Sequence, residues 1–411
     1  MHAFGIHPAN IYLPAPGVDQ QKWAVVACDQ FTSDPAYWQQ LEEQVGNAPS
    51  ALRIIYPEVY LSQGESRIPS IRAAMDRYLA ENTLTCQVEN GFVLMERITE
   101  SGKRIGLVAA VDLEDYDYTP GTTAPIRATE GTILSRIPPR VKIREGAPLE
   151  SPHVMLLMDD PENKVLGRLY ENRAALPCVY DTDLLMGGGH LTGWAVTEEA
   201  QKEALYAALK ELNADCNGFL FAVGDGNHSL ATAKACWENR KKEISEAEQA
   251  TDPARFALVE IVNLHSPALQ FEPIHRMVFG ADGRSLLLDF AGYLRERGMS
   301  LIPGEDIFFV FAGEKTGFSI KNTKNVLPVA VLQPFLDRFL KENKNCEIDY
   351  IHEKDAVVKM SRDQGTGVLL TSIEKSSLFP GIVSGGVLPR KTFSMGHGHE
   401  KRYYMECRKI K

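Results

Sequence analysis

The chain of 411 residues is 44% hydrophobic and 24% charged, which is typical of a globular protein with two or three domains and excludes a disordered, collagen-like or coiled-coil chain. Its formal net charge of −10 disfavours broad binding to nucleic acid or to anionic lipid. The sequence has no apolar run of about 18 residues and no basic start followed by a long apolar stretch, so we expect a cytoplasmic protein without membrane contact. The seven cysteines are scattered and form no Cys-x-x-Cys pair, which favours reduced thiols.

Short apolar runs and helical patterns alternate in the first part of the chain. Residues 23–28 predict a short buried strand, and Pro35 marks the first position of a helix. Apolar residues at helical spacing predict a second helix over residues 68–79. Residues 92–97 and 104–111 predict the two strands of a hairpin.

Residues 119–150 are rich in Pro, Gly, Thr and Arg. So many Arg and Thr residues within an acidic protein favour a functional loop over a linker. The chain then returns to short strands and amphipathic helices. Strands are predicted at residues 153–158, 179–186, 219–223, 256–264 and 269–278, and helices at residues 198–212 and 230–240.

From about residue 281 onward, helical and strand patterns alternate again. The alternation along the whole chain predicts an α/β to α+β fold with mixed sheets. We expect an α/β core over residues 1–280 that carries the functional site. A smaller α+β domain should follow over residues 281–411, with its boundary near residues 280–283.

The sharpest local feature is the sequence Gly-Asp-Gly-Asn-His-Ser at residues 224–229, between a predicted strand and a predicted helix. Such a turn directs backbone N–H groups outward at a helix N-terminus, where phosphate binds well. Asp225 can bind a metal or accept a proton, and His228 can act as an acid or base. The alternative is an ordinary turn in which Asp225 or Asn227 caps the helix. Phosphate contacts are predicted for Gly224, Gly226, Asn227 and Ser229.

This turn resembles the Asp-Gly-His-His-Arg signature of a large bacterial domain-of-unknown-function family. Residues 27–33, 186–190 and 273–276 fit the same family, and the resemblance covers at least residues 20–280 and the tail from Leu388. More distantly, the turn resembles the phosphate-binding turn of the ParB/sulfiredoxin-like fold. That superfamily includes nucleotide-hydrolysing partition proteins, sulfiredoxin and free-serine kinases.

The resemblance implies that Asp225 and His228 are active-site residues and that Gly226 and Asn227 contact phosphate. Two departures matter. Ser229 stands where the relatives usually have Arg, so another cation is needed, and the candidates are Arg127, Arg136 and Arg140. Asn227 stands where sulfiredoxin has its reactive Cys, which disfavours that activity.

A second group of candidates lies at residues 127–132. Glu130 can deprotonate a substrate hydroxyl, while Arg127 and Thr129 can hold a phosphate; the alternative is a capping box on a solvated loop. Asp29 follows a predicted buried strand, where ligands of α/β sheets often bind, whereas the neighbouring Cys28 is expected to be a core residue.

Three further segments carry candidate residues. His190 follows three glycines that allow close approach to a ligand, and a flexible hairpin is the alternative. His275 and Arg276 can face the phosphate site, although a solvated or ion-paired strand edge is the more common role of such a pair. For the tail with His397, His399 and Cys407, a disordered or solvated segment is favoured over a zinc site.

Together these features predict a nucleotide-dependent phosphotransferase that acts on a small hydroxylated metabolite, with free serine as the acceptor implied by the kinase relatives. Mg²⁺ with ATP or ADP would be the cofactor, Asp225 a metal ligand, and Glu130 or Asp29 the group that deprotonates the acceptor. The expected partners are the small-molecule substrate and the nucleotide, with a homo-oligomer left open. The alternatives are a nucleotide hydrolase or switch, and a non-enzymatic regulatory module that retains the turn.

Overall fold

The computed structural model describes residues 4–32, 34–132, 137–216, 218–323, 326–389 and 391–411. The chain forms two compact units, which divide between Leu269 and Gln270, whereas the sequence predicted a division after residue 280. The C-terminal segment Gly396–Lys411 returns to the first unit. Unit 1 comprises Met1–Ala128, Thr132–Leu269 and Gly396–Lys411, and unit 2 comprises Thr129–Gly131 and Gln270–Met395.

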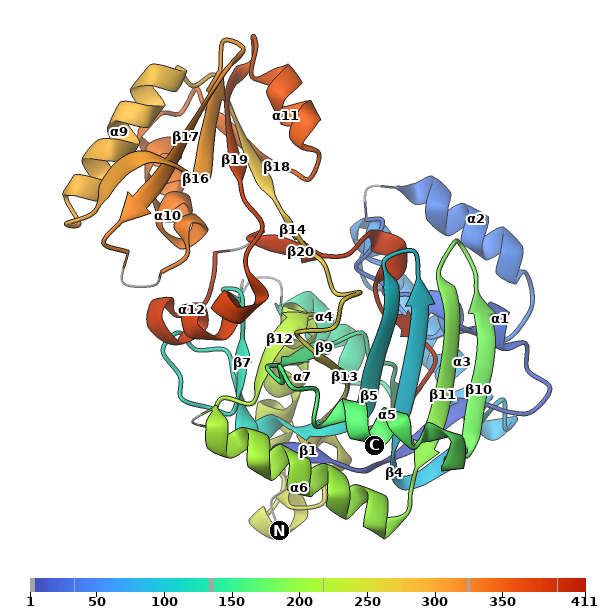
Figure 1. The fold of residues 1–411 in the computed structure, drawn as a ribbon. Helices are drawn as coiled ribbons and strands as arrows, with labels where there is room; N and C mark the ends of the chain where they lie inside the picture. Colours follow the sequence, from blue (N-terminus) through green and yellow to red (C-terminus); the bar gives the residue numbers. More distant parts are fainter. Residues whose placement is uncertain (1–3, 33, 133–136, 217, 324–325, 390) are drawn as a thin grey trace. The chain divides into compact units, whose positions relative to one another are not determined.

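Unit 1 is built around a mixed sheet that has eleven strands among the described residues (Figure 1). Nine strands follow the order β10-β11-β4-β5-β13-β9-β12-β7-β6, while β1 pairs with β5 and β2 with β4. The pairing is antiparallel except for β12–β7, β13–β9 and β6–β7. The strands are β1 (Ile6–His7), β2 (Ala9–Pro14), β4 (Leu84–Thr99), β5 (Gly102–Asp112), β6 (Tyr116–Asp117), β7 (Ile126–Ala128), β9 (Met155–Met158), β10 (Cys178–Leu184), β11 (Gly189–Val196), β12 (Phe221–Asp225) and β13 (Phe256–Asn263).

Alternating side chains of the central strands fill two separate hydrophobic cores. Val93 and Met95 of β4 enter one core, while Phe92 and Leu94 enter the other, as the two-residue period of a strand requires. Helices α2 and α3 contribute to the first core, and α6 and α7 to the second. The sheet is therefore covered on both faces. The α-helices of unit 1 are α1 (Gln20–Trp23), α2 (Pro35–Val45), α3 (Ile68–Ala80), α4 (Ile137–Arg144), α5 (Leu166–Glu171), α6 (Glu199–Asp215), α7 (Asn227–Arg240) and α8 (Glu246–Gln249).

Unit 2 contains an antiparallel sheet of strand order β17-β16-β19-β15-β18. Helices α9 and α10 pack on one face, and α11 packs on the other through Val357 (Figure 1). The elements are β14 (Phe271–Pro273), β15 (His275–Phe279), α9 (Gly283–Arg295), β16 (Ser300–Phe311), β17 (Glu314–Lys321), α10 (Pro328–Glu342), β18 (Glu347–Ile351), α11 (Lys354–Met360), β19 (Gly365–Leu370), α12 (Leu378–Gly385) and β20 (Phe393–Met395).

The predicted mixed α/β class is confirmed, and so are most of the predicted elements. Pro35 begins α2 with Asp34 as its cap, and the hairpin closes with Thr99 opposite Gly102. The strand predicted at residues 23–28 is only Val25–Val26, because Trp23 ends a short helix. The strand predicted at residues 269–278 is two strands interrupted at Ile274.

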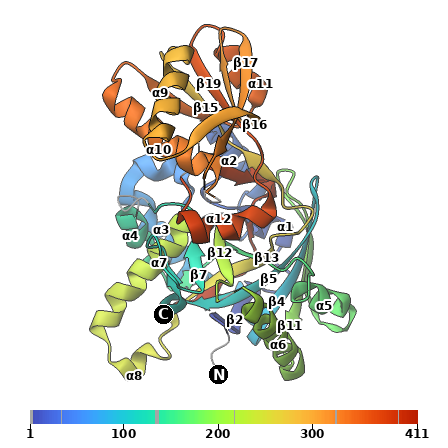
Figure 2. The same ribbon diagram turned by 60° about the vertical axis from the view of Figure 1, so that its left-hand side comes forward.

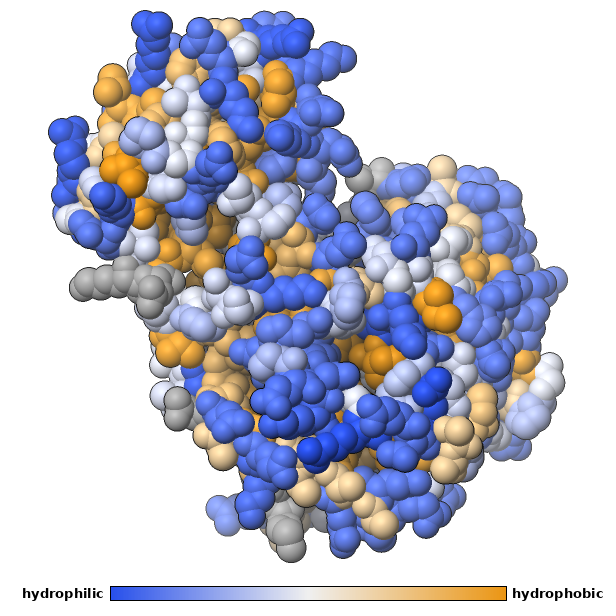
Figure 3. All heavy atoms as spheres, viewed as in Figure 1, coloured by the Kyte–Doolittle hydropathy of each residue, from blue (hydrophilic) through white to orange (hydrophobic). Residues whose placement is uncertain are grey.

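The stretch at residues 119–150 contains regular structure. It includes β7 and α4, and α4 packs beside α7 (Figure 2). No helix in the described ranges is long and apolar enough to cross a membrane. The face of the molecule in Figure 3 is mostly hydrophilic, in keeping with the charged fraction of 24%.

The C-terminal segment was expected to be disordered or solvated, and that expectation is wrong. Tyr403–Tyr404 forms β21, which pairs with β3 (Val25–Val26), and Arg408–Lys409 forms β22, which pairs with β8 (Leu149–Glu150). Tyr404 is 1% exposed. Composition alone misled because the basic and aromatic residues of this segment have their partners inside unit 1.

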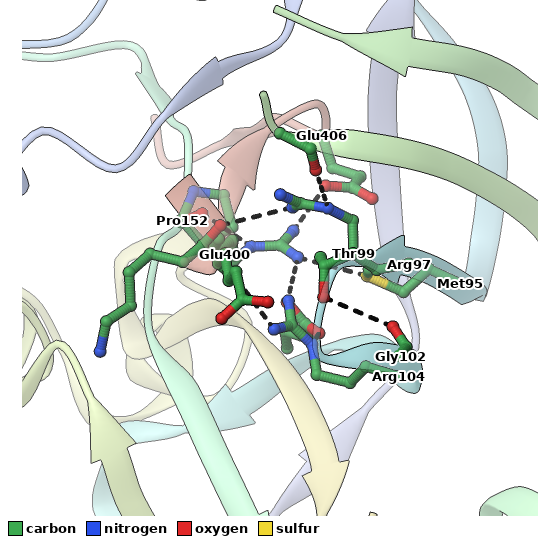
Figure 4. Close-up of polar contacts among 12 residues, drawn as sticks. Met95, Arg97, Thr99, Gly102, Arg104, Pro152, Glu400 and Glu406 are labelled. Carbon is green, nitrogen blue, oxygen red and sulfur yellow. Dashed lines mark hydrogen bonds and ion pairs between the residues drawn. The ribbon is translucent and has the colours of Figure 1, made fainter. Parts of the chain in front are cut away.

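Buried charges hold this segment in place (Figure 4). Arg402 lies 2.8 Å from Glu260, a fully buried carboxylate on β13, and 2.5 Å from Glu406. Arg104 of β5 also pairs with Glu260, at 3.2 Å. Arg97 of β4 donates to carbonyl oxygens of the segment. Burial alone would raise the pKa of Glu260, but Arg104 and Arg402 lower it, so its charge is retained.

We predict that Glu260→Gln lowers the free energy of unfolding of unit 1 by about 3–5 kcal/mol, because the amide leaves the buried Arg104 without its carboxylate partner and Arg402 with Glu406 alone. Urea denaturation followed by circular dichroism measures the change. Glu65→Gln is the matched control, since Glu65 pairs with Lys142 between exposed side chains, and it should unfold like the wild type. Equal stability of the two variants would contradict the assigned role of Glu260.

Candidate functional site

The predicted strand–turn–helix is present, with β12 ending at Asp225 and α7 beginning at Asn227. Gly226 is the N-cap and has φ of +80°, a conformation that favours glycine. A Cβ at Gly226 would also lie 3.0 Å from the Cα of Val154. The helix begins earlier than predicted, so Asn227, His228 and Ser229 lie in its first turn. The turn therefore places the N-terminus of a 14-residue helix, with its positive end of the helix dipole, directly after Asp225.

Asp225 is held by a cation that the sequence analysis missed. The Lys401 Nζ lies 3.1 Å from Oδ2 of Asp225, and Oδ1 accepts from the Gly226 N–H at 2.9 Å. Burial alone would raise the pKa of Asp225, but Lys401, the nearby His153 and the Gly226 N–H lower it. Asp225 is thus an ionised carboxylate beside an ammonium group, both largely shielded from solvent.

A second residue missed by the sequence analysis, His153, connects the turn to three other groups. Its Nε2 lies 3.0 Å from the Ser229 Oγ and 3.8 Å from the Asp29 Oδ2, and its Nδ1 lies 2.8 Å from the Tyr404 Oη. Burial opposes protonation, but the Asp29 carboxylate and the neighbouring Cys28 raise the pKa of His153 to about 10. At neutral pH His153 is an imidazolium that donates from both nitrogens.

The structure thus brings together three predicted residues, Asp29, Asp225 and Ser229, and adds Lys401 and His153. We call these five residues the Asp225 cluster. His228 lies beside it in the first turn of α7, where its carbonyl accepts from Thr232 at 2.7 Å. Asn227 is buried and donates to the Val223 carbonyl at 3.4 Å. The phosphate roles of Gly224, Gly226, Asn227 and Ser229, and the catalytic roles of Asp29, Asp225 and His228, stay predictions.

Arg127 and His190 are engaged away from the Asp225 cluster, whereas Arg140 lines a cavity next to it. Arg127 donates to the Ala124 carbonyl at 2.8 Å and lies over the Phe219 ring, and Arg140 pairs with Glu58. Arg136 lies outside the described residues. The ring nitrogens of His190 lie 2.8 Å from Asp183 and 2.6 Å from Asp181, both on the neighbouring strand β10 of the hairpin.

Four predicted residues belong to unit 2. Thr129 accepts from the Leu388 N–H at 2.6 Å, and Glu130 forms a bridge with the same residue. The expectation that His275 and Arg276 form a solvated or ion-paired strand edge is wrong, because β15 lies between β19 and β18 and the residues are 4% and 0% exposed. Burial lowers the pKa of His275 to about 4, so it is neutral. The phosphate and catalytic roles predicted for these four residues stay predictions.

A cavity of ≈ 170 Å³ adjoins the Asp225 cluster within unit 1. His153, Ser229, Tyr404 and Cys28 form its polar end, and apolar side chains form most of the remaining wall. Cys28, expected to be a core residue, is half-buried and lines this cavity.

The side chains of the Asp225 cluster do not fit a metal ion bound directly by the protein. Within the described ranges, no three His, Cys, Asp or Glu side chains are grouped so as to hold one. One oxygen of Asp225 faces Lys401, and a cation at that carboxylate would be repelled by the ammonium. We therefore derive no step through a metal held by Asp225.

Comparison with known proteins now identifies the family. A family model described as "Protein of unknown function (DUF1015)" matches residues 12–348. The chain belongs to this family. The membership predicted from the turn at residues 224–229 is therefore confirmed, and no protein of curated description matches the sequence.

Several solved structures are distantly similar to the chain. A point mutant of a free serine kinase in complex with AMP is 12% identical, covers 74% of this chain and 92% of its own, and has a TM-score of 0.40. A conserved hypothetical protein from Pyrococcus furiosus is 11% identical, with coverages of 70% and 90% and a TM-score of 0.35. SbnI with a C-terminal truncation from Staphylococcus aureus is 8% identical, with coverages of 70% and 82% and a TM-score of 0.35. Scores this low identify no activity, so function has to follow from the residues of this chain.

We predict that His153 titrates at about pH 10 and that Asp29→Asn lowers this pKa by at least ~1, because the carboxylate favours the imidazolium. The folded-state pKa is raised, so the stability that His153 contributes is complete below about pH 6.5 and is lost as the pH rises toward 10. Heteronuclear NMR of the imidazole resonances measures both values.

His190 is the internal control for this titration. Its pKa is raised by Asp183 and Asp181, and it should be the same in the wild type and in Asp29→Asn. An unchanged pKa of His153 in the variant would show that Asp29 does not hold the proton on this imidazole.

Proposed function

We propose that the protein is a nucleotide-dependent phosphotransferase that transfers a terminal phosphoryl group to a hydroxyl of a small metabolite. The observation that supports this most is the pairing of Asp225 with Lys401 at the N-terminus of α7, next to the imidazolium of His153. This arrangement combines an ionised carboxylate with two cations and a helix N-terminus. Phosphoryl transfer needs positive groups that stabilise the negative charge of the phosphate. It also needs a carboxylate that orients the attacking hydroxyl.

Three groups suit the phosphate. The N-terminus of α7 offers the positive end of the helix dipole, with no side chain on the N-cap Gly226. Lys401 supplies a point charge, and the His153 imidazolium adds a second positive charge nearby while its two N–H groups donate to Ser229 and Tyr404. Ser229, which replaces the Arg expected from the resemblance, binds His153. The missing cation is therefore supplied from two other parts of the chain.

Asp225 suits the acceptor. In the proposed step the hydroxyl oxygen bonds to the terminal phosphorus, the bond from phosphorus to the bridging oxygen breaks, and the nucleoside phosphate leaves with that electron pair. The hydroxyl proton passes to the Asp225 carboxylate. The low pKa of Asp225 keeps it ionised and ready to orient the hydroxyl, as the aspartate of kinase catalytic loops does. Asp29 acts as a positioning residue through His153.

ATP and ADP are the first nucleotides to assay, and free serine is the first acceptor. Mg²⁺ would be held by the phosphate oxygens of the nucleotide, which commonly supply much of its coordination shell. Transfer to an acceptor supports the kinase, whereas release of inorganic phosphate without transfer would support the hydrolase alternative.

We predict that Asp225→Asn lowers phosphotransfer by about 10²-fold or more, because the amide neither accepts the proton nor balances Lys401. ³¹P NMR of ATP mixed with a panel of hydroxylated metabolites measures the transfer. Asp282→Asn is the control, since Asp282 only caps α9 in unit 2, and it should match the wild type. Full activity of Asp225→Asn would remove the turn from the mechanism.

A further inference from the structure

We propose that the small molecule recognised at the Asp225 cluster carries an apolar group about the size of a six-membered ring, which lies in the adjoining cavity. The inference rests on the proposed function in so far as this molecule is the phosphoryl acceptor. The acceptor would then be an alcohol with an aromatic or branched aliphatic group, larger and less polar than free serine.

The position of the cavity links it to the turn. Ser229, Leu230 and Ala233 of α7 form part of its wall, so it extends along the same helix whose N-terminus carries the proposed phosphate site. The His153 ring reaches both places, since it lines the cavity and lies 3.4 Å from the point where a Cβ of Gly226 would be. A ligand in the cavity therefore has its polar end beside the Asp225 cluster.

The size of the cavity fits one ring. An engineered apolar cavity of about 150 Å³ in another protein takes up benzene, and the volume here is ≈ 170 Å³. Met75 of α3, Ile143 of α4 and Leu258 of β13 meet Leu230 and Ala233 around this space. Elements from four parts of unit 1 thus form a wall of aliphatic side chains, against which a ring or a branched chain packs well.

The charged groups in the wall are already paired. Arg140 pairs with Glu58, and Arg144 lies 2.6 Å from Glu150, which also binds Arg408. An ammonium or carboxylate group placed deep in the cavity would find no additional counter-ion among the described wall residues, and burying such a group is costly. The wall therefore favours an apolar group over the charged backbone of an amino acid.

The polar end of the cavity fixes the orientation of the ligand. Cys28, His153, Ser229 and Tyr404 meet there, and hydrogen bonds join His153 to both hydroxyl groups. A ligand hydroxyl at this end lies beside the Asp225 cluster, of which His153 and Ser229 are members, while its ring points away from the cluster. One apolar wall with a few convergent polar groups is the usual form of a small-molecule site.

Isothermal titration calorimetry of the full chain with benzyl alcohol, compared with methanol, tests the inference. We expect the ring to strengthen binding by about 10- to 100-fold, the value of burying one ring. Ala233→Leu fills the cavity and should abolish this difference. Ala235→Leu is the matched control, because Ala235 also lies on α7 but is not among the described residues that line the cavity. This variant should bind benzyl alcohol like the wild type.

Met75→Ala provides the opposite change if Ala233→Leu does not fold. The enlarged cavity should bind 2-naphthylmethanol more tightly than the wild type does. Equal binding of benzyl alcohol and methanol by the wild type, or unchanged binding by a folded Ala233→Leu variant, would overturn the inference.

Phosphotransfer assays with ATP separate this result from the proposed function. One outcome is that the wild type binds benzyl alcohol and Ala233→Leu loses that binding, while no alcohol is phosphorylated. This result would support the proposed ligand class and reject the phosphotransferase. Phosphoryl transfer to serine by a protein that does not bind benzyl alcohol would support the phosphotransferase and reject the proposed ligand class.

Discussion

The pairing of Arg402 with Glu260 and Glu406 is the interaction on which the site depends. It buries three charges in the core of unit 1 and thereby fixes the course of the C-terminal segment. Lys401 and Tyr404 lie close to Arg402 in the sequence. Lys401 contacts Asp225, and Tyr404 contacts His153. Buried ion pairs add little net stability, but removing one partner is costly, so this segment has a single place in the fold.

The Asp225 cluster balances two cations against two carboxylates within an acidic chain. The net charge is −10, yet Lys401, the His153 imidazolium and the N-terminus of α7 converge near two carboxylates. Burial strengthens each of these interactions, because water screens them less. An acidic surface repels a polymer such as nucleic acid, whereas a site with two cations and a helix N-terminus suits the small phosphorylated ligand proposed above.

Local patterns predicted much of the fold. The hairpin β4–β5, the start of α2 at Pro35, and the strand and helix around residues 224–229 depend on neighbours in the sequence, and all are present. The cluster was only partly predictable. Asp225 and Ser229 stand in a recognisable turn, but Lys401 is brought to Asp225 by contacts that no local pattern records.

The wrong predictions also come from contacts between residues that are distant in the sequence. The tail appeared solvated because its charges and aromatic rings have distant partners, and β15 appeared to be an edge because strand order cannot be read from a single strand. His153 looked like the polar start of a buried strand. Its importance comes from Asp29, Ser229 and Tyr404, which lie in three separate segments.

The most direct test of the account is the affinity of the full chain for ATP, measured by isothermal titration calorimetry on the wild type and on Lys401→Gln. Lys401 directly precedes Arg402 in the C-terminal segment, so the variant removes the cation at the turn while the ion pairs of Arg402 stay in place. We expect the wild type to bind ATP and the variant to bind it at least ~10-fold more weakly, as the loss of one buried phosphate contact implies. Absence of ATP binding by the wild type, or equal binding by both proteins, would contradict the account.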